Sequence, residues 1–81
     1  MKLHGFDGLL NLLSLLRSHS IDYRLEQQVD DGIEVSFAFV GMRVEVSVLA
    51  DKVEYSLFRG TEDVISGSES LLQLIEDETR P

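Results

Sequence analysis

Apolar and polar residues alternate almost without interruption between Ile21 and Arg59. Successive residues of a β-strand point to opposite faces of a sheet, so each alternating run predicts a strand with one buried side. The phase of the alternation changes only at segments whose composition favours a turn. The pattern therefore predicts four strands, at about residues 21–29, 33–40, 43–49 and 53–59.

The three segments between these strands predict the hairpins and their registers. Residues 30–32 suit a three-residue loop in which Gly32 adopts the left-handed conformation that bulky residues avoid. Gly41 and Met42 suit a two-residue loop of type II′, and residues 49–52 form a four-residue connection. Each register keeps the apolar residues on one face. The expected cross-strand neighbours are Val29 with Ile33, Leu25 with Phe37, Phe39 with Val44, and Val48 with Val53.

Two amphipathic helices are predicted to flank the strands. The first, at about residues 6–19, has an apolar stripe at helical spacing that consists of Phe6, Leu9, Leu10, Leu13 and Leu16. The second, at about residues 67–78, begins beside Ser66 and Glu69, which have the spacing of a capping box. The order α-β-β-β-β-α predicts an α+β fold for residues 1–81 as one domain. We expect a single four-stranded antiparallel meander with both helices packed on one face.

Leu12 and Leu15 lie beyond the edge of the predicted stripe and need a second contact. The favoured interpretation is that they touch the C-terminal helix, because small domains hide most of their large apolar groups. The alternative is that Leu12 and Leu15 form a homodimer contact.

The charge of the chain narrows the choice of partners. Its 15 acidic and 7 basic residues give a net charge of −8, so direct binding to nucleic acid or to an anionic membrane is not expected. A basic protein partner would suit this charge, although solubility is the plainer explanation. The absence of cysteine excludes disulfides and thiolate metal sites and fits a cytoplasmic protein. The apolar run at residues 9–16 is too short to span a bilayer.

Sequence motifs for catalysis are not found. His4 and His19 are the two histidines, and neither has a partner at the spacing of a metal pair on one helix face. The serines stand in no nucleophile elbow, and no glycine-rich phosphate loop follows a strand. We therefore expect no cofactor, no metal and no enzymatic activity, with a small-ligand or catalytic domain as a remote alternative.

The second face of the predicted sheet carries small side chains at its centre, so another molecule could approach it closely. We hypothesise that this face binds a partner or a second copy. Its candidate residues are Val40, Arg43, Glu45, Ser56 and Phe58. A plain solvent-exposed face is the simpler interpretation, since single exposed apolar residues are common. In the predicted registers Glu26 and Glu34 occupy different rows of this face.

Acidic residues gather in the C-terminal quarter of the chain. The candidate acidic patch consists of Glu62, Asp63, Glu69, Glu76, Asp77 and Glu78. It would dock a basic protein, or it is an ordinary solvated helix end.

The strand at residues 53–59 leaves a further question open. It is either an exposed edge that accepts a strand from another chain, or it is covered when residues 63–65 fold back along it. The second interpretation is favoured.

Together these observations predict a non-enzymatic, small acidic protein-binding module, such as an inhibitor, an immunity-like protein or an adaptor. It would use the open sheet face and the acidic C-terminal end. The alternative is a self-associating structural domain or subunit without independent activity.

Overall fold

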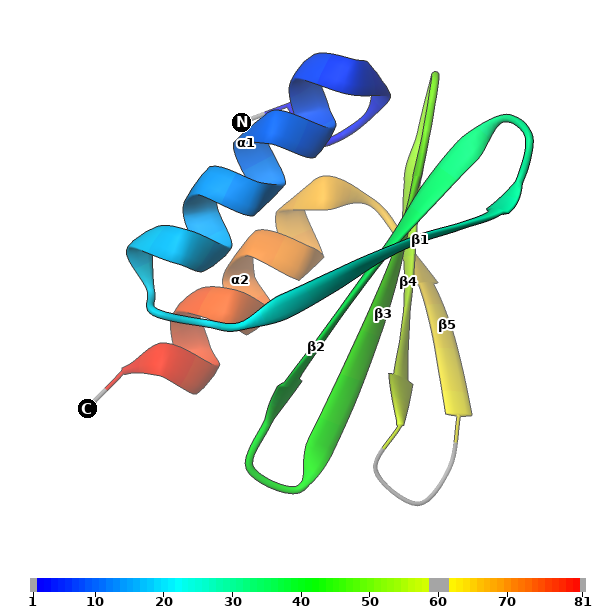
Figure 1. Ribbon diagram of the computed structural model, residues 1–81. Coiled ribbons are helices and arrows are strands. Elements are labelled where there is room, and N and C mark those ends of the chain that lie inside the picture. The colour runs from blue at the N-terminus through cyan, green and yellow to red at the C-terminus, as the bar shows by residue number, and fades with distance from the viewer. Residues whose placement is uncertain (1, 59–61, 81) are drawn as a thin grey trace.

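The computed structural model describes residues 2–58 and 62–80, with the backbone alone for residues 62–66 and 68. Five strands form one antiparallel sheet in the order β1-β2-β3-β4-β5. Both helices lie on the same side of this sheet, and its other side faces away from them (Figure 1). The elements are α1 (Gly5–Ser18), β1 (Tyr23–Val29), β2 (Gly32–Phe39), β3 (Met42–Leu49), β4 (Val53–Phe58), β5 (Glu62–Ser66) and α2 (Ser68–Thr79).

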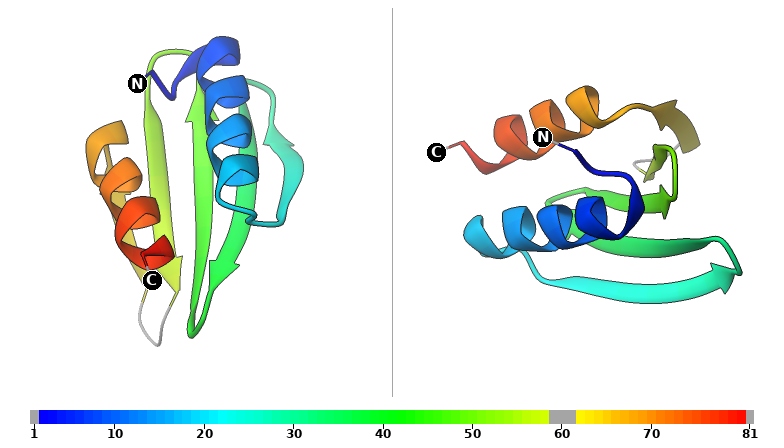
Figure 2. Two further views of the ribbon diagram at one scale, coloured as in Figure 1. Left: turned by 90° about the vertical axis from the view of Figure 1, so that its left-hand side faces the viewer. Right: turned by 90° about the horizontal axis from the view of Figure 1, so that it is seen from above.

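The predicted α+β fold, with a four-stranded antiparallel meander and one helix at each end of the chain, is confirmed. The inner face of the sheet, which faces the helices, carries the alternating apolar residues of β2, β3 and β4. α1 packs over β3 and α2 over β4 (Figure 2). The largest fully buried side chains are Leu3, Leu12, Leu16, Leu71, Ile75, Val35, Val44 and Val46.

The fifth strand settles the question of the edge at β4. Backbone pairing joins Tyr55 to Ile65, Ser56 to Val64 and Leu57 to Asp63, so β5 folds back along β4 and covers it. The favoured interpretation is confirmed. The edges of the sheet are therefore β1 and β5.

The register of the third hairpin is confirmed, with Val48 opposite Val53. The register of the second hairpin differs from the prediction by two residues, because its loop is Val40–Gly41 and Phe39 pairs with Met42. Gly41 has a φ of +76°, which suits the second central position of a tight turn. This register buries Met42 in the core, where it is 5% exposed, whereas the predicted loop would have left its side chain in solvent.

The predicted register of the first hairpin is also wrong by two residues. Tyr23 pairs with Phe37, and a bulge between Glu26 and Val29 precedes a tight turn that closes with Val29 opposite Gly32. Gly32 does not have a positive φ. A Cβ atom at Gly32 would lie 2.5 Å from the Leu49 Cδ2 atom and 3.5 Å from the Val29 Cγ2 atom. A side chain at this position would require the Leu49 side chain to move, and it would lie on the outer face of the sheet, where the bulge has placed Val29.

The buried face of α1 is rotated from the predicted stripe. Gly8, Leu12 and Leu16 are buried, whereas Phe6 is 73% and Leu10 48% exposed. Because a Cβ atom at Gly8 would overlap the Leu3 backbone, the N-terminal segment packs closely on this face of the helix.

The rotated buried face of α1 explains where Leu12 and Leu15 make their contacts. Leu12 is fully buried and Leu15 is partly buried against the same core. Both leucines therefore pack within one chain, and Leu12 offers no surface to a second copy.

The predicted capping box at the start of α2 is not formed. Ser66 belongs to β5, and Gly67 is the N-cap residue with a φ of +112° and no side-chain cap hydrogen bond. The sharp entry from β5 into α2 requires this positive φ, which glycine adopts readily.

Replacing Leu12 by alanine tests the orientation of α1. Leu12 is 0% exposed and Leu10 is 48% exposed, so Leu12→Ala leaves a cavity whereas Leu10→Ala does not. Leu12→Ala is expected to lower the free energy of unfolding by about 2–5 kcal/mol, and Leu10→Ala by less than about 1 kcal/mol. Urea unfolding followed by circular dichroism measures both values. Similar losses for the two variants would contradict this orientation.

Candidate functional site

The outer face of the sheet, opposite the helices, brings together most of the predicted partner surface. Arg43 pairs with Phe58, and Glu45 pairs with Ser56 in the next row. Val40 does not join them, because it lies in the β2–β3 turn and is fully exposed. The shift in the second hairpin places Ala38 beside Arg43 instead.

Phe58 is covered by a charged neighbour. The Arg43 guanidinium carbon lies 4.5 Å from the centre of the Phe58 ring, which is the geometry of a cation–π contact. Phe58 is half-buried while Arg43 is exposed. The aromatic ring is therefore an apolar area that becomes accessible when the Arg43 side chain moves.

Three glutamates come together on the neighbouring part of the outer face. Glu26 on β1 pairs directly with Glu34 on β2, and Glu45 on β3 lies one row away from Glu34. They line a hollow of about 440 Å³, together with Ser36 and Ala38. Asp22, Arg24 and Arg43 line it as well, so four acidic and two basic side chains surround it and acidic charge is in excess. We call this the acidic hollow.

The acidic hollow perturbs its central carboxyl group. Partial burial raises the pKa of Glu34, and the negative charges of Glu45 and Glu26 raise it further. Like charges directly opposite each other on two strands destabilise a sheet. The folded chain thus holds the three carboxylates in an arrangement that a positive group would stabilise.

Sequence reasoning missed this cluster because of the register of the first hairpin. The predicted pairing placed Glu26 and Glu34 in different rows, and the actual pairing makes them direct neighbours. The two-residue turn and the bulge between Glu26 and Val29 cause the difference. The available signal was one outward-facing glutamate on each of three adjacent strands. The correct register was needed to see that these glutamates are neighbours.

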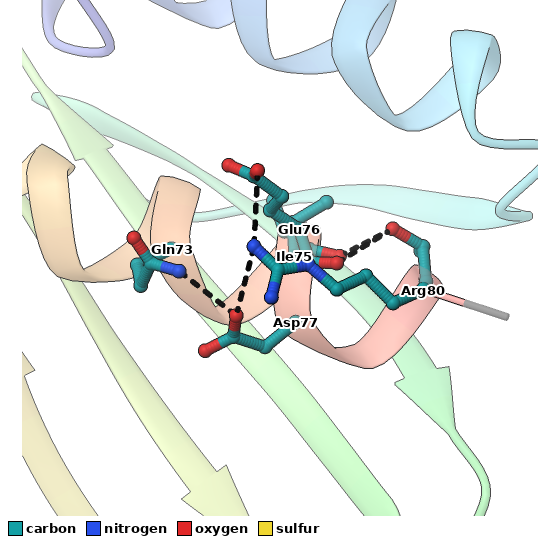
Figure 3. Close-up of polar contacts among 6 residues, drawn as sticks. Gln73, Ile75, Glu76, Asp77 and Arg80 are labelled. Carbon is teal, nitrogen blue, oxygen red and sulfur yellow. Dashed lines mark hydrogen bonds and ion pairs between the residues drawn. The ribbon is translucent and has the colours of Figure 1, made fainter.

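The acidic C-terminal patch is divided by the structure. Glu69 lies in the first turn of α2, whereas Glu76, Asp77 and Glu78 lie in its last turns. Arg80 approaches Glu76 at 3.4 Å and Asp77 at 3.9 Å (Figure 3). The Gln73 side-chain amide also donates a hydrogen bond to Asp77 at 2.8 Å. Glu62 and Asp63 have side chains outside the described residues.

This local pairing leaves the end of α2 less free to attract a partner. The Thr79 hydroxyl donates to the Ile75 carbonyl at 2.7 Å, and Arg80 offsets part of the acidic charge (Figure 3). The acidic hollow differs, because the described ion pairs do not include Glu26, Glu34 or Glu45.

The two histidines of the sequence do not come together in the structure. His4 and His19 are at opposite ends of α1, far from each other along the helix. Among residues 2–58 and the described side chains of α2, no three His, Asp or Glu side chains are placed to hold one metal ion. Neither α1 nor α2 has the length and apolar content needed to cross a membrane.

Comparison of the chain with models of protein families, with curated proteins and with solved structures found no match. The functional argument therefore depends on the surfaces of the molecule itself.

Glu34→Gln tests the electrostatic strain in the acidic hollow. Because the folded-state pKa of Glu34 is raised, protonated Glu34 favours folding, and that contribution is lost as the pH rises through the raised pKa. We expect Glu34→Gln to match the wild type at about pH 4 and to become increasingly more stable toward about pH 7. Urea unfolding across this range measures the difference.

Glu78→Gln is the control for this prediction, since Glu78 is exposed on α2. It should change the pH profile less than Glu34→Gln does. A Glu34→Gln variant that is less stable than the wild type at neutral pH would contradict the electrostatic interpretation.

Proposed function

We propose that this protein is a non-enzymatic, acidic protein-binding module, of the inhibitor or adaptor kind, that docks a basic partner on the outer face of its sheet. The observation that carries the proposal is the clustering of Glu26, Glu34 and Glu45 in the acidic hollow, where the pKa of Glu34 is raised. A lysine or arginine of a partner placed there would relieve the repulsion among the three carboxylates.

The rest of the outer face supports docking. Ser36, Ser47 and Ser56 are short side chains and let a partner approach the backbone of the central strands. The Phe58 ring under Arg43 adds an aromatic group at the margin, and aromatic residues are enriched at interfaces. The surface thus combines charge with a site for apolar contact.

The remaining parts of the proposal rest on the composition. The net charge of −8 would speed association with a basic protein at low salt. A reducing compartment such as the cytoplasm is proposed because the chain has no cysteine.

Self-association is the second functional class, and the structure supports it less. Leu12 is buried, and a symmetric contact through the outer face would bring two acidic hollows together. Size-exclusion chromatography with light scattering separates the two classes. A monomer is expected at micromolar concentration.

Two matched triple variants test the proposed function. One changes Glu26, Glu34 and Glu45 to glutamine, and the other changes Glu76→Gln, Asp77→Asn and Glu78→Gln, so each removes three negative charges. Affinity capture from the host lysate at low and high salt, with quantitative identification of the retained proteins, compares them with the wild type. We expect at least one basic protein to be retained by the wild type and the α2 variant, lost by the acidic-hollow variant, and released by salt.

Equal loss in the two triple variants would show attraction to the overall charge alone and would contradict a specific site. Retention by the acidic-hollow variant would contradict the proposed surface. Phe58→Glu in a separate variant, with Val40→Glu as its control, tests whether the aromatic margin also contributes.

A further inference from the structure

Large apolar side chains are exposed on the inner side of the molecule, between α1 and β1. Phe6 and Leu10 on α1 are 73% and 48% exposed, and Leu25 on β1 is 47% exposed. Leu25 pairs with the buried Val35, so it belongs to the inner face of the sheet. Phe6 and Leu10 are one helical turn apart on α1. A contiguous group of exposed apolar residues marks an interaction site more often than residues scattered singly do.

Two observations place one flank of α1 beside β1, one at each end of the helix. At one end, Phe6 and Leu9 line a cavity of about 350 Å³ together with Gln27, Asp30 and Asp31. At the other end, the Arg17 guanidinium donates a hydrogen bond to the Tyr23 hydroxyl at 3.4 Å. Leu10 and Leu25 lie between these ends along α1 and β1, outside the lining of the cavity. We call the surface between the two ends the α1–β1 groove.

The groove exists because two helices do not cover five strands. α1 lies over β3 and α2 over β4, and β1 runs beside α1 rather than beneath it (Figure 2). Neither helix therefore covers the inner face of β1, and Leu25 on that face remains 47% exposed.

The charges at the ends of the groove specify the occupant. Asp30 and Asp31 line its cavity at the end near Phe6, and Asp7 is exposed in the first turn of α1. Arg17 stands at the opposite end, where it shares a surface hollow with Asp22, so the charges of these two residues offset each other. A helix has a positive N-terminus and a negative C-terminus. These charges favour a helix that lies parallel to α1, with its N-terminus and basic residues near Asp30 and Asp31.

We propose that the α1–β1 groove binds a basic amphipathic helix of a partner protein, parallel to α1, with its apolar side chains on Phe6, Leu10 and Leu25. The groove spans Phe6 to Arg17, which corresponds to about three helical turns. A second copy of this chain is a poor occupant, because each copy has a net charge of −8 and α2 carries Glu76, Asp77 and Glu78 in its last turns. The groove is on the opposite side of the sheet from the acidic hollow, so this proposal stands independently of the proposed function.

A synthetic peptide provides the probe for this groove. It has about 18 residues, which is long enough for partial helicity, with leucines on one face, alanines elsewhere and lysines in its first two turns. The control peptide has the same composition with its leucines scrambled. Fluorescence anisotropy with labelled peptides measures the dissociation constants for the full-length protein.

Three single variants of the protein locate the binding site. Leu10→Gln and Leu25→Gln each replace a half-exposed leucine, and we expect each to weaken binding of the amphipathic peptide about tenfold. Val40→Gln is the matched control, because Val40 is a fully exposed apolar residue in the β2–β3 turn, and it should leave binding unchanged. Circular dichroism and urea unfolding verify that the variants are folded.

Nuclear magnetic resonance of the wild-type protein gives a test that does not depend on variants. A spin label at the peptide N-terminus should broaden the amide signals of Asp30 and Asp31 more than that of Arg17, while the signals of Leu10 and Leu25 shift. The proposal fails if the scrambled peptide binds equally well, if Leu10→Gln and Leu25→Gln have no effect, or if the shifts lie on α2 or the outer face. If the spin label instead broadens the amide signal of Arg17 more than those of Asp30 and Asp31, the parallel orientation is overturned.

Other occupants have their own signatures and would also overturn the proposal. A concentration-dependent dimer that is lost in Leu10→Gln and Leu25→Gln would identify a second copy. An extended peptide whose backbone amides pair with β1 would identify strand addition at the free edge. The acidic-hollow triple variant leaves the groove unchanged. Its affinity for the amphipathic peptide should therefore fall no more than that of the α2 triple variant. This comparison separates failure of the groove proposal from failure of the proposed function.

Discussion

The structure depends on the burial of one face of β2, β3 and β4 beneath two helices. Val35, Val46 and Tyr55 lie side by side across these strands, and each is at most 3% exposed. Because side chains alternate between faces, this burial also determines which residues reach the outer face. The positions of Glu34, Glu45 and Ser56 on the opposite side are a direct consequence of the same alternation.

The alternation of apolar and polar residues predicts well which face of the sheet a residue lies on. It predicts poorly which residues lie opposite it on the neighbouring strands. A shift of two residues in either of the first two hairpins keeps the alternating apolar side chains on the inner face, apart from Val29 beyond the bulge, so the hydrophobic pattern cannot choose between the registers. Turn geometry and local packing make the choice. Burial of Met42 favours the Val40–Gly41 loop. The first hairpin is closed by a tight turn with Val29 opposite Gly32 and by a bulge between Glu26 and Val29. The third hairpin was predicted correctly because Val48 and Val53 flank a connection of defined length.

The two candidate surfaces were hidden from the sequence for related reasons. The acidic hollow requires Glu26 and Glu34 to be direct neighbours, which the predicted register did not allow. The α1–β1 groove requires Phe6 and Leu10 to be exposed, whereas helical periodicity placed them in the buried stripe. The buried face of α1 includes Gly8, against which the Leu3 backbone packs. Helical periodicity gives no sign of this contact.

The core explains why such surfaces are tolerated in a domain of 81 residues. Buried side chains of α1 and α2 meet those of β2, β3 and β4 without any contribution from the acidic hollow or from Leu10 and Leu25. Repulsion among partly exposed carboxylates is weakened by solvent and salt, and a half-exposed leucine costs less than a cavity in the core. The edge strand β1 is where both surfaces meet, since it supplies Glu26 to one side and Leu25 to the other. A partner on either side would therefore act on the strand that the helices of this chain leave uncovered.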